Sequence, residues 1–477
     1  MKVVIVWFRR DLRLEDNTAL SKAISYSKQK QAGLLPIFQI DPHFVDMKYD
    51  MSHEYFFKTL SVFTNEARQK GLYLHIFYLE AIHMFRRLMD AYEIDAVFYN
   101  QDDAGYGAQR DHEVSAFLRK NGIYPSPWTD AHIHGADDIV KQDGSMYKVF
   151  TPYFRSWSRA EKPKMMEIDP HFLCSTQMIR NQSLSNQGER VLEHLVQSSK
   201  RHWVHVDASI AKEALFRFID EKLSMYHKNR DIPFANSTSK LSRFLKTGVL
   251  SPRMVYYAVL QHESPQGAKD VFIKELAWRD FYNMVYAAHP HMAETEIDER
   301  FRNISWNHDH KLFQAWCEGR TGFPIVDAGM RQLNKEGWMH NRLRMITASF
   351  LVKDFLIDWR LGEAYFADKL IDYDPASNIG GWQWAASVGT DAVPYFRIFN
   401  PVIQSKKFDP DGLFIKRYIP ELKHIPDEFL HVPWKMTPQI EGSSSCIIGE
   451  DYPNPLIDHQ VQRRLAIETY ETAKNMT

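Results

Sequence analysis

The chain opens with MKVVIVWFRRDLRLEDN, residues 1–17, in which the apolar run VVIVWF ends at a charged cluster. Three further short runs rich in apolar or β-branched residues follow, and amphipathic stretches separate them. The runs lie at residues 34–40, 72–78 and 96–100, and the stretches at 53–70 and 82–92. Strands that alternate with helices in this way favour a parallel sheet. The sequence therefore predicts a doubly wound, Rossmann-like α/β domain over residues 1–130.

The pattern changes after residue 130. From about residue 163 the chain is polar and irregular, so residues 131–207 are predicted to connect two domains. Almost every segment after residue 208 has helical periodicity, which predicts an all-α domain over residues 208–477. Neither GxGxxG nor GxxxxGKS/T follows the first apolar run, so the usual dinucleotide and triphosphate motifs are absent there.

Composition and charge exclude several kinds of protein. The net charge of −1 means that nucleic acid would have to be bound by a local basic patch. Cys174, Cys317 and Cys446 leave at least one thiol unpaired, which argues against a disulfide framework and for a reducing compartment. No apolar run approaches the roughly 18 residues of a membrane-spanning helix, and the first is too short for a signal peptide. A cytoplasmic protein is expected.

Two segments carry groups suited to phosphate. In NSTSKLS, residues 236–242, the hydroxyls of Thr238, Ser239 and Ser242 precede a helical pattern, and hydroxyls beside free helix N–H groups can hold a phosphate. A plain helix N-cap is the better-supported alternative on this segment alone. Residues 397–424 hold six Lys or Arg against three acidic residues, which suits a phosphate track, although a solvated face is the usual meaning of such a run.

A third segment, VFIKELAWRDFYNMVY at residues 271–286, divides one predicted helix into two faces. Glu275, Trp278, Arg279 and Tyr282 share one stripe, and apolar residues occupy the opposite one. A carboxylate, an indole, a guanidinium and a phenol together suit a base contact beside a phosphate contact. A solvated charged face explains the same pattern equally well.

Two later segments combine polar and aromatic residues. Asn341, Arg342 and Met345 crowd one side of a helix predicted over residues 341–358, where a core Met at helical spacing is the commoner explanation. The stretch LIDYDPASNIGGWQWAAS, residues 370–387, places acceptors, amides and indoles beside glycines that permit close backbone approach. A loop between core helices explains this stretch equally well. His289, His291, His308 and His310 lack matching ligands, so no metal is expected.

Taken together, these motifs resemble those of the photolyase/cryptochrome family, most closely its class I cyclobutane pyrimidine dimer (CPD) photolyases. The likeness covers essentially the whole chain and is densest over residues 236–408. It is carried by VWFRRDLRLEDN, YKVFTPYFRSW, TSKLS, KELAWRDFY, RTGFPIVDAGMRQL, GWMHNRLRMITASFLVKDFLIDWR and NIGGWQWAASVGTDAVPYFRIFNP. The resemblance implies a DNA-repair lyase that contains FAD, binds UV-damaged DNA, and works as a monomer without an obligate protein partner or a membrane.

The resemblance also assigns roles to residues. FAD would be held by Tyr226, Thr238, Ser239, Lys240, Leu241, Ser242, Asp372, Tyr373 and Asp374, with Asn378 at flavin N5. The dimer and its DNA strand would contact Arg230, Glu275, Trp278, Arg279, Tyr282, Asn341, Arg342, Met345, Trp384 and Gln404. Trp382, Trp359 and Trp306 would carry electrons from the surface to oxidised flavin, although core packing is the simpler explanation of each indole.

The implied mechanism begins with extrusion of the dimer from the duplex, which costs a few kcal/mol. Excited, fully reduced FAD then donates an electron, the cyclobutane ring opens, and the electron returns. Glu275 would protonate or hydrogen-bond the dimer carbonyl as charge develops there.

One departure concerns the antenna chromophore. The family's folate pattern has Asn-Glu four residues before its Arg-Asp, whereas this chain has Tyr106-Gly107 before Arg110-Asp111. The usual folate contact is therefore not expected, and the α/β domain carries another antenna or none.

Three rival functions stay open. A cryptochrome would sense blue light without repair, but the sequence given has no long polar tail after Ala473. A (6–4) photolyase would present a His pair near residues 341–345, where only His340 stands. A flavin oxidoreductase would need a nicotinamide motif, which the sequence lacks.

Overall fold

The computed structural model describes residues 2–46, 50–168 and 177–476, without the side chains of Phe44 and Asp46. Its residues form two compact units. The first comprises residues 1–147, 151–224 and 239–288, and the second comprises 148–150, 225–238 and 289–477. The domain boundaries expected at residues 130 and 207 stay a prediction.

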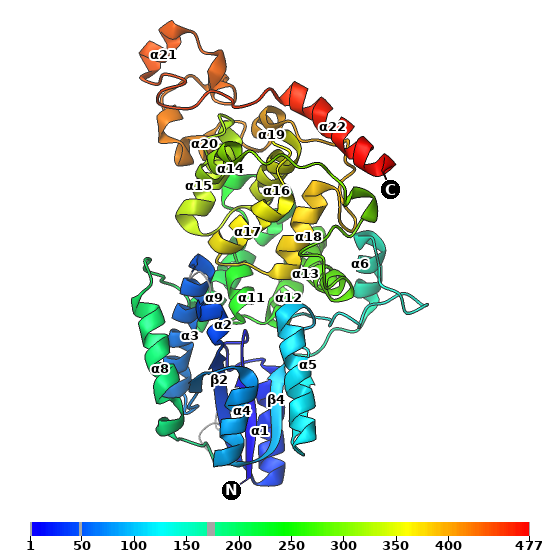
Figure 1. Cartoon of the computed structure of the whole chain (residues 1–477). Helices are drawn as coiled ribbons and strands as arrows, with labels where there is room; N and C mark the ends of the chain where they lie inside the picture. The colour runs from blue at the N-terminus through cyan, green and yellow to red at the C-terminus, as the bar shows by residue number, and fades with distance from the viewer. Residues whose placement is uncertain (1, 47–49, 169–176, 477) are drawn as a thin grey trace. The chain divides into compact units, whose positions relative to one another are not determined.

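The first unit is built on a five-stranded parallel sheet of strand order β3-β2-β1-β4-β5. Figure 1 labels two of its strands, β2 and β4. Its strands are β1 (Lys2–Phe8), β2 (Gly33–Ile40), β3 (His75–Tyr78), β4 (Glu93–Asn100) and β5 (Tyr124–Trp128). Its helices are α1 (Thr18–Lys30), α2 (Pro42–Asp46), α3 (Met51–Gln69), α4 (Ala81–Ala91), α5 (Gly105–Lys120), α6 (Phe150–Arg159, its first residue in the second unit), α8 (Gln182–Gln197), α9 (Ala208–Glu221), α11 (Ser242–Thr247), α12 (Pro252–Gln261) and α13 (Gln266–Ala288), with η1 (Leu223–Met225) at its edge. The predicted doubly wound fold is confirmed.

The period of two along β1 explains why helices cover both faces of the sheet. Val3, Ile5 and Trp7 pack with residues of α4 and α5, whereas Phe8 points the other way and contacts Phe63 of α3. Every residue of β1 after Lys2 is buried, as expected for a central parallel strand.

The stretch that the sequence showed as polar and irregular contains helix α8, which packs against β3. Gly188 permits this packing, because a Cβ atom there would lie 2.0 Å from the carbonyl oxygen of Ile76. Leu192 and Leu195 are buried on the same helix. Tertiary contact therefore overrides the polar composition, and residues 182–197 are helical where an irregular segment was expected.

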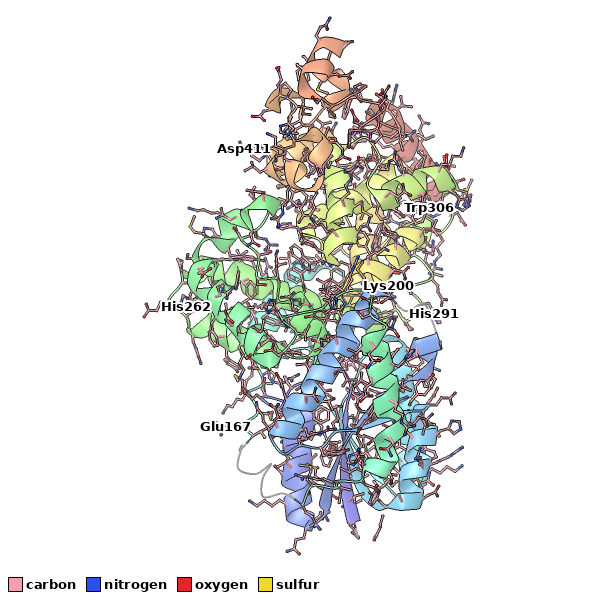
Figure 2. The ribbon with its side chains drawn as sticks, turned by 90° about the vertical axis from the view of Figure 1, so that its left-hand side faces the viewer. Glu167, Lys200, His262, His291, Trp306 and Asp411 are labelled. Atoms are coloured by element: carbon pink, nitrogen blue, oxygen red, sulfur yellow. The ribbon has the colours of Figure 1, made fainter. Side chains whose placement is uncertain are left out.

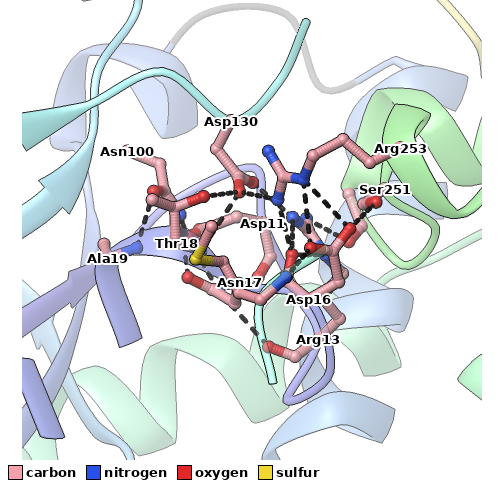
Figure 3. A network of polar contacts seen from close by, with 12 residues as sticks. Asp11, Arg13, Asp16, Asn17, Thr18, Ala19, Asn100, Asp130, Ser251 and Arg253 are labelled. Atoms are coloured by element: carbon pink, nitrogen blue, oxygen red, sulfur yellow. Dashed lines mark hydrogen bonds and ion pairs between the residues drawn. The ribbon is translucent and has the colours of Figure 1, made fainter. Parts of the chain in front are cut away.

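A buried ion network ties distant segments of the first unit together (Figure 3). Arg253 of α12 donates to Asp16 at 3.0 Å and to Asp130 at 2.6 Å. Arg13 also pairs with Asp130, and Ser251 donates to Asp16. Burial opposes the charge on Asp130, but Arg13 and Arg253 outweigh it and lower the pKa of that carboxyl to about 2.

The second unit is helical. Its elements are α10 (Tyr226–Asn229), η2 (Pro233–Ala235), η3 (Glu299–Phe301), α14 (His310–Glu318), α15 (Pro324–Glu336), α16 (Asn341–Ser349), the π-helical η4 (Phe350–Asp354), α17 (Trp359–Lys369), α18 (Pro375–Ala386), α19 (Pro401–Phe408), α20 (Leu413–Tyr418), η5 (Pro420–Leu422), η6 (Asp427–Phe429), η7 (Pro433–Lys435), α21 (Pro438–Ser444) and α22 (His459–Asn475). In the described part of the chain, no helix is both long and apolar enough to cross a membrane.

The helix predicted over residues 341–358 is shorter in the structure, where α16 ends at Ser349. It ends in the π-helical turn η4, in which the N–H of Phe355 donates to the carbonyl of Phe350. Asp354 in this turn is buried and accepts a hydrogen bond from His459 of α22 at 2.6 Å. The end of α16 thus coincides with the contact to α22. Helix α22 lies about 100 residues further along the chain, so the local sequence pattern could not predict this end.

Candidate functional site

Helix α13 of the first unit has the two faces that its sequence predicted. Ile273, Ala277, Phe281 and Met284 are buried in the unit. Glu275, Trp278, Arg279 and Tyr282 are half-buried on the other stripe. The rings of Trp278 and Tyr282 stack at a centroid distance of 5.5 Å and an angle of 29°. This face is thus a partly enclosed aromatic and charged surface, and not a fully solvated one.

Asp280 anchors α13 within the first unit. Its carboxylate accepts hydrogen bonds from the indole of Trp157 at 2.8 Å and from the backbone N–H of His134 at 3.0 Å and Ile133 at 3.3 Å. Burial raises the pKa of Asp280 to about 7, although these donors oppose the shift. Asp280 lies outside the predicted stripe, and the sequence carries no signal for it because its partners lie more than 120 residues away.

The segment predicted to hold phosphate differs from a plain capped helix. Leu241 occupies the N-cap of α11 and makes no side-chain cap hydrogen bond. Lys240 has a left-handed backbone with a φ of 54°. The Thr238 hydroxyl oxygen is buried and finds no hydrogen-bond partner among the described residues. A buried hydroxyl in that state is available to an oxygen-rich ligand, which is what a diphosphate would supply.

In the second unit, α16 and α18 carry a second group of predicted residues. Asn341 and Met345 lie side by side, with the Asn341 amide 3.8 Å from the Met345 sulfur. Asp374 caps α18 by accepting from the N–H of Ser377 at 3.0 Å. Trp384 and Gln404 are half-buried in this unit. The pairing of Asn341 with Met345 that the helical phasing predicted is therefore observed.

Asn378 is oriented by a residue that the sequence did not single out. Its amide nitrogen donates to Glu363 Oε1 at 3.0 Å, and the Tyr373 hydroxyl donates to the same oxygen at 3.1 Å. Burial raises the pKa of the Glu363 carboxyl. With its nitrogen held in this way, the carboxamide of Asn378 presents its oxygen in the other direction.

The two arginines nearest Asn341 are also engaged. Arg344 binds both oxygens of Asp372, at 2.8 and 3.0 Å. Arg342 pairs with Asp231 at 2.9 Å. Arg230 lies over the buried ring of Tyr226, with 5.4 Å between its guanidinium carbon and the ring centroid.

The three tryptophans of the predicted chain differ in burial. Trp382 and Trp359 are buried, whereas Trp306 is half-buried at the edge of the second unit (Figure 2). Trp382 packs against Phe366 and Trp316, and Trp306 meets Tyr470 edge-on at 6.2 Å. No ring contact joins Trp359 to either of the other two in the part of the chain that the structure describes. Sequence reasoning missed Trp316, because its position in the core depends on contacts between distant helices.

The residues that replace the folate pattern, Tyr106 and Gly107, lie at the start of α5. A Cβ atom on Gly107 would lie 2.3 Å from an oxygen of Asp102, so position 107 has no room for a side chain. The Tyr106 ring stacks on His43 at 5.5 Å, and its hydroxyl donates to Asp41 at 2.6 Å. Gly107 therefore offers no carboxylate to a ligand at this position.

Comparison with known proteins gives two family matches. Residues 4–170 match the model described as DNA photolyase, and residues 272–472 match the FAD binding domain of DNA photolyase. The chain is 46% identical to the deoxyribodipyrimidine photo-lyase of Alkalihalophilus pseudofirmus, over 98% of this chain and 97% of the relative. It is 37% identical to the enzyme of the same name from Escherichia coli, over 99% of both.

Solved structures agree in fold. A bacterial class III photolyase from Agrobacterium tumefaciens superposes with a TM-score of 0.87 at 32% identity, over 99% of this chain and 98% of that one. An archaeal photolyase from Sulfolobus tokodaii, described with two FAD molecules, gives 0.82 at 32% identity, over 99% and 100% of the two chains.

Proposed function

The chain belongs to the DNA photolyase family, and from that premise we propose that it acts as a deoxyribodipyrimidine photo-lyase. It binds ultraviolet-damaged DNA, extrudes the cyclobutane pyrimidine dimer and splits it under blue light. The observation that carries the proposal is the half-buried face of α13, which sets Glu275 beside the stacked rings of Trp278 and Tyr282. That face occurs in a chain similar to photo-lyases over its full length.

The cofactor is FAD, since the chain contains the FAD binding domain of the family. When bound in its reduced form, FAD supplies the electron that opens the ring on absorption of blue light. Thr238 and its neighbours Ser239, Lys240, Leu241 and Ser242 would hold the diphosphate. The buried, unsatisfied hydroxyl of Thr238 supports this assignment.

Residues of the second unit are also proposed to contact FAD. Asp372, Tyr373 and Asp374 lead into α18, and Tyr226 is buried on α10. Glu363 holds the amide nitrogen of Asn378, so the Asn378 oxygen would face flavin N5 and accept a hydrogen bond there.

The lesion would be held by stacking and charge. In the first unit, Trp278 and Tyr282 offer adjacent π-faces to an extruded base. In the second unit, Asn341 and Met345 lie side by side and offer a semi-polar surface. Trp384 would also contact the dimer. Glu275 would stabilise the dimer carbonyl while that group carries extra charge. Arg230, Arg279 and Gln404 would contact the strand, and Arg342 would contact the DNA at the dimer. Trp306, Trp359 and Trp382 would return electrons to oxidised flavin. We further propose a monomer and a cytoplasmic location; the free thiols of Cys317 and Cys446 support the location.

One assay tests the function. Purified protein is mixed with DNA that contains thymine dimers, and dimer loss is measured under blue light and in the dark. We expect loss in the light only. A blue-light sensor of the same fold would bind FAD but leave the dimers unchanged in both conditions.

A further inference from the structure

Two arginines of α16 are held by different kinds of partner. Arg344 makes a bidentate pair with Asp372, whose side chain is only 2% exposed. Arg342 meets a single oxygen of Asp231, whose side chain is 42% exposed. A pair with a solvated carboxylate contributes little to stability, whereas breaking a buried pair leaves an uncompensated charge. The Arg342 pair is therefore the one that a ligand can exchange.

Contacts other than Asp231 hold the Arg342 side chain in place. Its guanidinium carbon lies 4.3 Å from the ring centroid of Phe408, a buried residue of α19. A planar guanidinium stacks on an aromatic face without needing a charged partner. The backbone of Arg342 is fixed as well, because its N–H donates to the His340 ring at 3.1 Å. Loss of the Asp231 charge should leave the guanidinium on Phe408.

The guanidinium also has unused donor capacity. Its Nε is buried and finds no acceptor among the residues that the structure describes. The guanidinium carries five N–H donors in a fixed fork, which matches the oxygens of a phosphate better than one carboxylate oxygen does. A second cation, Lys407, lies 5.2 Å from the same Phe408 ring and adds positive charge beside it.

We propose that Asp231 is a placeholder for DNA at Arg342: its carboxylate occupies the guanidinium in the free protein, and a phosphate oxygen of the DNA backbone replaces it on binding. The inference rests on the proposed function, in which Arg342 contacts DNA. The displaced carboxylate stays close to the incoming phosphate and repels it. Asp231 thus weakens backbone binding, so the protein leaves undamaged DNA sooner and lesion contacts decide where it stays.

The test uses FAD-loaded protein and two duplexes of one sequence, with and without a single thymine dimer. Asp231→Asn removes the charge and keeps the shape, and Glu450→Gln removes the same charge at an exposed position outside the predicted contacts. We expect D231N to bind both duplexes roughly three- to tenfold more tightly at low salt, with a gain that shrinks as salt screens the repulsion. Weaker binding, or a change no larger than that of E450Q, would overturn the proposal. A gain confined to the damaged duplex would overturn the assignment to phosphate.

A double-mutant cycle shows whether Arg342 carries the effect. In an Arg342→Ala background, D231N should gain no more than E450Q does. A full gain in that background would show that Asp231 acts through the general field and not through Arg342. Binding to the undamaged duplex alone tests whether a DNA phosphate replaces Asp231 at Arg342. A parent protein that binds the two duplexes equally would contradict the proposed repair function, but it would not affect this test.

Discussion

At position 107 a single added methyl group would already overlap Asp102, so no carboxyl-bearing side chain can reach a ligand from there. Methenyltetrahydrofolate should therefore bind weakly or not at all. The check is gel filtration after mixing at one equivalent, followed by absorbance at the folate band. Gly107→Glu should not restore binding, because the new side chain would have to displace Asp102. A folate band that stays with the parent protein would contradict this expectation.

Trp278 and Glu275 should fail in different ways when each is replaced by Ala. Trp278→Ala removes a stacking surface worth roughly 1–3 kcal/mol per base, so binding to damaged DNA should weaken by about ten- to a hundredfold. Binding to undamaged DNA, which depends on phosphate contacts, should change little. Glu275→Ala should lower the repair yield per photon more than the affinity, because the carboxyl matters most when the dimer is charged. If both variants bind and repair as the parent does, the dimer is not held on α13.

Trp306→Phe should slow the photoreduction of oxidised flavin by an external reductant. Phe keeps an aromatic ring against Tyr470, so FAD content and dark DNA binding should stay close to those of the parent. Repair by protein that is already reduced should persist, because the repair electron comes from the flavin. Equal photoreduction rates in variant and parent would remove Trp306 from the electron path.

The sequence predicted the face of α13 because residues three and four apart share one side of a helix. It also predicted the pairing of Asn341 with Met345. It missed Glu363, Asp231 and Trp316. Each of these residues contacts a side chain from another helix or loop, and sequence periodicity does not predict contacts between separate elements. The site could therefore be predicted where one helix carries it, and not where several elements converge.

At the scale of elements, Asp280 makes the stability of the first unit depend on pH. Burial raises its pKa from 3.8 to about 7, so the folded chain binds this proton more tightly than the unfolded chain does. The free energy of unfolding should therefore decrease as the pH rises from about 4 to about 7. Asp280→Asn carries no such proton, so its stability deficit relative to the parent should shrink over that range.

Melting temperatures between pH 5 and pH 8 give the comparison. Asp411→Asn, at an exposed position of the second unit, is the matched control and should follow the parent at every pH. A deficit of Asp280→Asn that stays constant with pH would show that Asp280 is ionised throughout, stabilised by its three donors.

Elements were predictable where local pattern and packing agree. The apolar runs of β1, β2 and β4 are continuous because both faces of a central parallel strand are buried. Strand β5 has the sequence YPSPW, and its two prolines argue against a strand in the sequence pattern. They are tolerated because β5 is an edge strand, paired with β4. Helix α8 was not predicted because most of its residues are polar.

At the scale of the whole molecule, the purified protein should contain about one FAD per chain and no stoichiometric metal. Within the described ranges, no group of three or more His, Cys, Asp or Glu side chains is placed to hold a metal ion. Absorbance of the released flavin and elemental analysis of the same sample measure both. A folded, flavin-free protein, or one metal ion per chain, would contradict the assignment.

The ion network around Asp16 has a consequence for biosynthesis. Arg253, the ion-pair partner of Asp16, is synthesised 237 residues later. At a translation rate of about 5–20 residues per second, the delay between the two residues is roughly 10–50 s. Until then a loop beside the first strand carries buried charge without its counter-ion, and loss of one partner in such a pair typically costs about 3–5 kcal/mol. The nascent sheet cannot reach its final stability on the ribosome ahead of α12. An mRNA truncated before the codons of α12 should therefore yield an incompletely folded chain, which chaperones bind and proteases degrade.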